Sequence, residues 1–190
     1  EGWVVGSQAE QIRDNHTATL MNDGRVLVTG GGLATLSAEI FDPNTQMWAS
    51  AGDMNISRRA HTATILNNGK VLVVGGQHGG QITSLVEMFD PETDRWDSYN
   101  LEGKWTDTSL MNVTRKNHTS TLLPDGSVLI TGGITRVYDE GGNGPTQLLE
   151  VAERYLVGGI KKWTLAGKMS YNRTGHTASL LPDGKVLIVG

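Results

Sequence analysis

Two kinds of residue that can do chemistry recur along this chain at matching places. The four histidines could ligate a metal through a ring nitrogen, and they are His16, His61, His118 and His176. Three residues before each histidine stands an arginine, a side chain suited to binding carboxylates in a bidentate fork; the four are Arg13, Arg58, Arg115 and Arg173. These positions define the two site hypotheses that the sequence raises.

The histidines are better explained by structure than by metal binding. No carboxylate or second histidine lies at ligand spacing near any of them. A polar residue that recurs at one repeat position usually makes the same structural hydrogen bond each time. We therefore expect hydrogen-bonding histidines, no metal and no cofactor.

The segment that carries each histidine is predicted to be a β-hairpin. In "RAHTATILNNGKVLVVGG" (59–76), two runs rich in Thr, Val, Ile and Leu flank an Asn-Gly pair. This composition favours strands, and Asn-Gly or Asp-Gly between them predicts a type I′ turn. The apolar run "VLVV" predicts a strand that is covered on both faces. Glycines stand eight residues after each histidine (Gly24, Gly69, Gly126, Gly184) and again fourteen residues after it (Gly30, Gly75, Gly132, Gly190).

A second repeated stretch is predicted to supply two more strands per repeat. "AEIFDPNTQMW" (38–48) and "VEMFDPETDRW" (86–96) match closely, and "AERYLVGGIKKW" (152–163) is a looser copy. Each is typical of a strand, a turn and a fourth strand that carries Trp. Since Trp105, not Trp96, has the repeat spacing to the next histidine, we expect a nine-residue insertion (105 − 96 = 9) there. Four antiparallel strands per repeat are the number in a propeller blade.

The repeat resembles the kelch repeat. The Gly-Gly pair, a downstream aromatic residue and the Trp carry the resemblance, and the spacings between histidines of 45, 57 and 58 residues bracket the kelch period of about 50. The amino-acid sequence of the repeat is most similar to those of exported bacterial kelch proteins and of the propeller domain of galactose-oxidase-like proteins. The expected fold is all-β, a kelch β-propeller of four-stranded antiparallel blades.

The propeller is expected to be incomplete, with about 3.5 of the usual 6–7 blades. Residues 1–11 would end a preceding blade, and 168–190 would give the first two strands of a further one. The blades between them are predicted at 12–52, 53–109 and 110–167. An arc of blades leaves inner faces uncovered, so a homo-oligomer that closes the ring is one possible arrangement.

The resemblance implies that the first strand of each blade lines a central channel, with the four arginines in a ring at one mouth. In some kelch adaptors, arginines at the matching place bind acidic peptide side chains. The interpretation that we favour for these arginines is pairing between blades with Asp, Glu or backbone carbonyl groups. The repeat glutamates Glu39, Glu87 and Glu153 are the obvious candidates for that pairing. The longest loop, "ITRVYDEGGNGPTQLL", adds further candidate ligand-binding residues, namely Arg136, Tyr138, Asp139 and Glu140.

Composition narrows the classes of partner. The chain has 190 residues, 16 Lys and Arg against 20 Asp and Glu, a net charge of −4, and no cysteine. We therefore expect no nucleic-acid partner and no disulfide, and no apolar run is long enough for a transmembrane segment. Five Asn-x-Ser/Thr sequons favour an extracellular, cell-surface or periplasmic protein; they begin at Asn15, Asn55, Asn112, Asn117 and Asn172.

The leading functional hypothesis is a non-catalytic scaffold that presents propeller loops to a protein or glycan. The first alternative is the propeller part of a galactose-oxidase-like copper-radical oxidase, or of a sugar isomerase, with its catalytic residues outside this segment. The second is a structural element of a surface assembly or a self-assembling propeller fragment.

Overall fold

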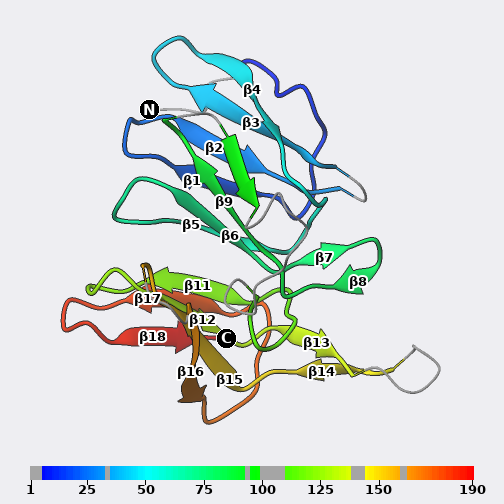
Figure 1. Cartoon of the computed structure of the whole chain (residues 1–190), viewed down its shortest axis with the longest axis vertical. Coiled ribbons are helices and arrows are strands. Elements are labelled where there is room, and N and C mark those ends of the chain that lie inside the picture. Colours follow the sequence, from blue (N-terminus) through cyan, green and yellow to red (C-terminus); the bar gives the residue numbers. More distant parts are fainter. Residues whose placement is uncertain (1–5, 33–34, 93–94, 99–109, 138–143, 159–161) are drawn as a thin grey trace.

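Every regular element in the residues that the structure describes is a β-strand, and turns and loops connect the strands (Figure 1). This computed structural model describes residues 6–32, 35–92, 95–98, 110–137, 144–158 and 162–190. Within these ranges there are three four-stranded antiparallel sheets and three two-stranded ones. The all-β prediction is confirmed, and so is the four-stranded antiparallel blade; the sheets do not close into a ring.

The first three sheets share one plan. The first has the order β1-β2-β3-β4, with bounds Thr17–Leu20, Val26–Thr29, Ser37–Asp42 and Met47–Asp53. The second has the order β5-β6-β9-β10, with bounds Thr62–Ile65, Val71–Val74, Val86–Asp90 and Arg95–Ser98. The third has the order β11-β12-β15-β16, with bounds Thr119–Leu122, Val128–Thr131, Val151–Tyr155 and Trp163–Lys168.

A fourth sheet contains β17 (Thr177–Leu180) and β18 (Val186–Val189). The first strands of successive sheets are neighbours, in the order β1, β5, β11 and β17. The domain boundaries at 52, 109 and 167 stay a prediction, as does the nine-residue insertion, which falls mostly outside the described residues.

The hairpin turns are of a different type from the one predicted. A type I′ turn needs a positive φ at both central residues, but only the glycine has one, as at Gly24 (φ 87°) and Gly69 (φ 81°). The Gly24 amide donates to the Met21 carbonyl at 3.1 Å, and the Met21 amide donates to the Arg25 carbonyl at 2.8 Å. This is a three-residue loop, a type I turn followed by a left-handed glycine that forms a bulge.

Two apolar clusters join the three large sheets. One lies between the first and second sheets and includes Leu27, Ile40 and Phe89, while the other lies between the second and third and includes Val128 and Trp163. Strand β6 serves both, because its side chains alternate between its two faces. Val71 and Val73 belong to the first cluster, and Leu72 and Val74 to the second. The prediction of a strand buried on both faces is confirmed for this strand.

A line of backbone hydrogen bonds also links the sheets, just before each first strand. The amide of Ala60 donates to the carbonyl of Asn15 at 2.9 Å, that of Asn117 to Ala60 at 3.0 Å, and that of Gly175 to Asn117 at 3.1 Å. All four residues have left-handed φ values between 52° and 64°. Asn and Gly tolerate this region, whereas Ala60 is strained in it.

Two small hairpins, here called the arms, project from the connections between second and third strands (Figure 1). One arm pairs β7 (Gln77–His78) with β8 (Gln81–Ile82), and the other pairs β13 (Ile134–Arg136) with β14 (Thr146–Leu148). The prediction of an irregular long loop is wrong at its base, because β13 and β14 form a ladder. Of the predicted loop residues, Tyr138, Asp139 and Glu140 lie outside the described residues.

Candidate functional site

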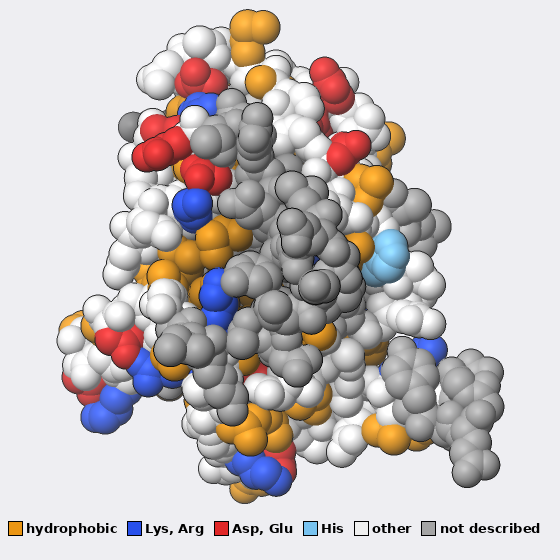
Figure 2. Space-filling model, viewed as in Figure 1, with side chains coloured by type: hydrophobic (Ala, Val, Ile, Leu, Met, Phe, Trp, Pro, Cys, Tyr) orange, Lys and Arg blue, Asp and Glu red, His pale blue; other side chains and the backbone are white. Residues whose placement is uncertain are grey.

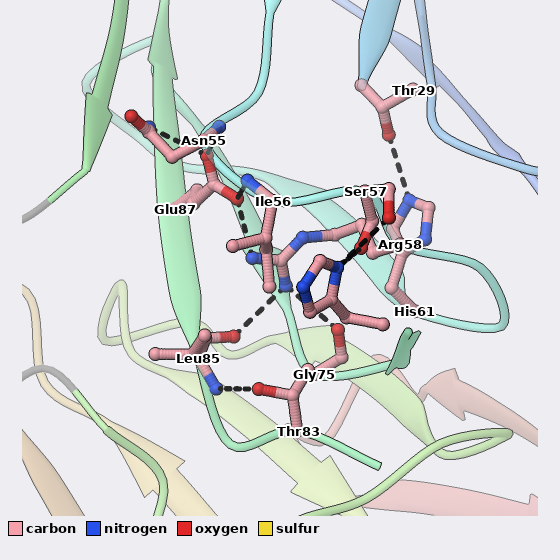
Figure 3. Close-up of polar contacts among 11 residues, drawn as sticks. Thr29, Asn55, Ile56, Ser57, Arg58, His61, Gly75, Thr83, Leu85 and Glu87 are labelled. Atoms are coloured by element: carbon pink, nitrogen blue, oxygen red, sulfur yellow. Dashed lines mark hydrogen bonds and ion pairs between the residues drawn. The ribbon is translucent and has the colours of Figure 1, made fainter. Parts of the chain in front are cut away.

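Three of the four repeat arginines meet the repeat glutamate of their own sheet, as Figure 3 shows for Arg58 and Glu87. Nη2 of Arg58 lies 2.7 Å from Oε1 of Glu87, and Nη2 of Arg115 lies 2.6 Å from Oε1 of Glu153. Both guanidinium side chains are 0% exposed. Arg13 pairs with Glu39 in the same way at 2.8 Å. The predicted partners are thus the observed ones, but the pairing is within a blade and not between blades.

The rest of each guanidinium group holds the backbone of the same blade. Nη1 of Arg58 donates to the carbonyl oxygens of Gly75 at 2.8 Å and Leu85 at 3.0 Å. Nη1 of Arg115 donates in the same way to Gly132 and Val151. The arginine therefore ties together the end of the second strand and the start of the third, which flank the arm.

Each glutamate also fixes the segment that leads into its blade. Oε2 of Glu87 accepts hydrogen bonds from the backbone amide of Asn55 at 2.7 Å and from its Nδ2 at 2.9 Å, and Oε1 accepts from the amide of Ile56 at 3.3 Å. Glu153 repeats this arrangement with Asn112 and Val113. The side-chain amides of the sequon residues Asn55 and Asn112 are thus used inside the scaffold.

Burial opposes the charge on these arginines. It lowers the pKa of Arg58 and of Arg115, while Glu87 and Glu153 respectively act in the opposite direction. A buried ion pair of this kind holds together only while both partners and their hydrogen bonds are in place. The structure places the side chains of Arg13, Arg58 and Arg115 in buried ion pairs, and their part in ligand binding stays a prediction.

Arg173 is placed differently from the other three arginines. Its Nη1 donates to the carbonyl of Gly190 at 2.9 Å, the counterpart of the bond from Arg58 to Gly75. The side chain is partly exposed, and no carboxylate is paired with it among the described residues. Of the four arginines that the sequence predicted to form a ring, three are therefore in buried ion pairs, and the side chain of the fourth, Arg173, is partly exposed.

Three of the histidines join neighbouring sheets. Nε2 of His61 lies 2.9 Å from Oγ1 of Thr29 and 3.1 Å from that of Thr17. His176 meets Thr131 and Thr119 in the same way, and His118 meets Thr62 at 2.9 Å. The expectation of structural hydrogen bonds is confirmed for these three. His16 is exposed, and it has no such bond within the described ranges.

The surroundings of these imidazoles lower their pKa and so favour the neutral form. Burial, helped by the charge of Arg58, lowers the pKa of His61 to about 3. Burial and the charge of Arg115 hold the pKa of His118 well below its usual value, and the pKa of His176 is lowered by burial and by Arg173. In a neutral imidazole, Nε2 either donates a hydrogen bond to a threonine hydroxyl or accepts one from it, depending on which ring nitrogen carries the proton.

The first strands of the four sheets line a shallow pocket of about 410 Å³. Its wall is made of threonine and serine hydroxyls, alanine methyl groups and histidine rings, including Thr17, Thr62, Thr119 and Thr177. Three of these hydroxyls, those of Thr17, Thr62 and Thr119, already lie within hydrogen-bond distance of a histidine Nε2. The surface is polar and uncharged, so its chemistry is hydrogen bonding.

The arms bring together charged residues that the repeat pattern did not single out. Nζ of Lys116 donates to Oε1 of Gln77 in the first arm at 2.8 Å. The Lys116 backbone also pairs with Ile134 in the second arm. Arg136, a predicted ligand-binding residue, lies in β13 beside them. The residue directly after each repeat arginine is variable (Asp14, Arg59, Lys116, Thr174), and this is the signal by which Arg59 and Lys116 could have been found.

The comparison with known families agrees with this architecture. The family model described as the Kelch motif matches residues 58–100. The matched segment runs from the buried Arg58 through all four strands of the second sheet. No curated protein matches the chain. Among the described residues, no helix has the length and apolar character needed to cross a membrane.

Proposed function

Because the chain combines a kelch motif with propeller-type sheets, we propose that it is a non-catalytic scaffold that binds a protein partner through its arms. Kelch repeats commonly mediate protein interactions. The proposal rests on a difference within each blade between the repeated residues and the arms. The repeated arginines, the glutamates and three of the four repeated histidines are used in internal bonds, whereas the arms differ in length and sequence between blades.

The arms have the properties of a recognition surface. They stand on rigid sheets, as binding loops commonly do. The second arm exposes two apolar side chains, Val137 (49% exposed) and Leu148 (41% exposed), next to the partly exposed Arg136. Apolar and arginine side chains together are typical of protein interfaces.

The proposal includes a location outside the cytoplasm, extracellular, periplasmic or at the cell surface. The sequons at Asn15, Asn117 and Asn172 support it, whereas the side-chain amides of Asn55 and Asn112 are bonded to glutamates. A glycan ligand is the alternative partner, and closure of the ring by further copies of the chain is the alternative assembly. Fractionation of the native source tests the location, a glycan array tests the ligand class, and sedimentation tests the assembly.

The main experiment measures binding of the full chain to an array of proteins from its source. We expect saturable binding to a partner and at least a tenfold weaker affinity for the double variant V137D/L148D. Met47→Asp is the control, because Met47 is 66% exposed on β4, in a different blade from the second arm. Absence of any saturable partner, or equal binding by the double variant and the control, would contradict the proposal.

A further inference from the structure

Three cationic side chains meet where the two arms join the body of the protein, and we call Arg59, Lys116 and Arg136 the basic cluster. We infer that the basic cluster binds an extended acidic peptide segment of the partner, with carboxylates on alternate residues. The inference rests on the proposed function, since it names the surface and the ligand chemistry through which the scaffold would act.

Backbone pairing places the three side chains together. Arg59 pairs with Gln77 through two hydrogen bonds of 3.2 and 2.8 Å, and Lys116 pairs with Ile134 through bonds of 3.1 and 2.9 Å. Residues paired directly across an antiparallel ladder project on the same face, with Cβ atoms about 5 Å apart. The side chain of Arg59 therefore lies beside that of Gln77, whose Oε1 holds Nζ of Lys116.

Arg136 joins the same face by strand periodicity. It lies two residues after Ile134 in β13, so its side chain and that of Ile134 project to one side of the strand. Thr135 between them points the other way, where it is 8% exposed and its Oγ1 lies 2.6 Å from Oγ1 of Thr114. Lys116 and Arg136 are therefore diagonal neighbours on the outer face of the arm, at about 7–8 Å.

The cluster is not neutralised within the described part of the chain. No ion pair there involves any of its three residues, and no hydrogen bond there involves the guanidinium group of Arg59 or of Arg136. The Nε atom of Arg136 is buried and without a partner among the described residues. The pKa of Lys116 is lowered by burial and then by the charges of Arg59 and Arg136. The three cations therefore repel one another in a chain whose net charge is −4.

The scaffold does not require these cations. The repeat position of Arg59 and Lys116 holds Asp14 in the first blade and Thr174 in the last. At that position Asp14 accepts a hydrogen bond from the amide of Gly32 at 2.8 Å, so an acidic residue also fits the fold. Mutually repelling charges that the fold does not need are a common feature of binding sites.

The spacing of the cluster fits an extended peptide. Side chains on one face of an extended chain are two residues apart, about 6.6–6.8 Å, which is close to the diagonal between Lys116 and Arg136. The guanidinium fork of Arg136 can hold a carboxylate bidentately. Leu148, opposite Ile134 in the ladder, adds an exposed apolar contact on the same face. Alternating carboxylates with one apolar neighbour would match all of these positions.

The cluster also lies away from the most acidic part of the surface in view. In Figure 2, most acidic side chains gather over the upper sheet, β1–β4, and most basic ones lie over the lower half of the molecule. The arms project from the middle and lower parts of the same view in Figure 1. An acidic segment would therefore approach this end of the protein without crossing the acidic sheet.

The test uses the full chain and arrayed decapeptides that carry Asp or Glu at positions i and i+2. Matched arrays carry Asn or Gln at these positions, or the two acidic residues at i and i+1. We expect wild-type protein to bind a subset of the i, i+2 peptides. K116Q/R136Q should bind them at least tenfold more weakly, and R59Q about threefold more weakly. Raising NaCl from about 0.05 M to about 0.5 M should weaken binding, because salt screens exposed charges.

The control is K168Q/K185Q, which removes two charges from exposed lysines elsewhere and should change the affinity less than twofold. Equal thermal unfolding temperatures would show that the variants fold. If K116Q/R136Q binds as the wild type does, or if heparin binds and no peptide does, the inference is overturned while the scaffold function stands. If a protein partner binds but no acidic peptide does, the inference is also overturned. If no partner of any kind binds, the proposed function itself fails.

Discussion

The buried ion pair between Arg58 and Glu87 gives the sharpest prediction about stability. Glu87→Gln keeps the size of the side chain but removes its charge, and leaves the guanidinium group of Arg58 paired only with two carbonyl oxygens. Removing one partner of a buried ion pair costs about 3–5 kcal/mol. The one oxygen of the new amide group can accept from some of the donors at Arg58, Asn55 and Ile56, but its NH2 group faces the others, donor against donor. We therefore expect a loss at the upper end of that range.

The assay is urea unfolding followed by tryptophan fluorescence. With a slope of about 1–3 kcal/mol per molar urea, the midpoint should fall by at least about 1 M. The control Glu150→Gln changes a 42% exposed carboxylate that pairs with Lys168, and should cost less than about 1 kcal/mol. The double variant R58M/E87L removes both charges and should recover most of the loss, because no unpaired charge is left buried.

Two results would refute the reasoning. A loss below about 1 kcal/mol for Glu87→Gln would mean that the pair is not holding the blade together. A double variant as unstable as Glu87→Gln would mean that packing, and not the unpaired charge, is what the single substitution disturbs.

Three more predictions concern the joints between blades. Gly75→Ala should lower the free energy of unfolding by about 2–5 kcal/mol, because the new Cβ would lie 2.6 Å from the carbonyl oxygen of Arg115 at a φ of +64°. The control is Gly79→Ala, at a φ of +54° with nothing within 4 Å of the new Cβ, which should cost about 1–2 kcal/mol. An equal loss in both variants would contradict the steric explanation. Lowering the pH from 6.5 to about 3 should destabilise the fold, because the folded-state pKa of His61 is lowered to about 3 and its imidazole binds a proton in that range only when the chain is unfolded. The free energy of unfolding should fall by about 5 kcal/mol over the whole range. In His61→Gln the urea midpoint should fall less steeply with decreasing pH. Ala60→Gly should raise the stability by about 0.5–1 kcal/mol, since glycine relieves the left-handed strain at the expense of some backbone entropy, and a lower melting temperature would show that no strain is stored there.

The sequence was most informative where one residue type serves one repeated geometry. Residues such as Gly75 and His61 recur because the backbone approach and the hydrogen bond that they make recur in each joint. The pairing of Arg58 with Glu87 was also within reach, since both residues repeat. Whether that pairing runs within a blade or between blades depends on how the sheets stack, and no local pattern contains this information.

The turns and the arms were harder to predict for physical reasons. An Asn-Gly pair serves both in a two-residue type I′ loop and in a three-residue loop with a bulge, and strand register decides between them. The arm strand that contains Arg136 is only three residues long, too short to show a clear alternation. The only sequence signal at Lys116 is that its repeat position is variable, because its role comes from contacts with Gln77 and Ile134, which are distant in sequence.

The bonds between neighbouring sheets have one consequence for how such a chain can change length. Each blade presents a histidine and an arginine carbonyl at its leading side and a glycine and a threonine at its trailing side. His61 meets Thr17 in the same way as His118 meets Thr62 and His176 meets Thr119. The leading side of one blade is complementary to the trailing side of the blade before it, and every joint between described blades uses the same two sides. Duplication of a whole repeat therefore adds a unit that fits both of its new neighbours, whereas loss of part of a repeat leaves a joint with unlike sides. A gene that encodes such a fold can therefore gain or lose whole blades without disturbing the joints. The arms take no part in these repeated bonds, so their sequences can then diverge between blades.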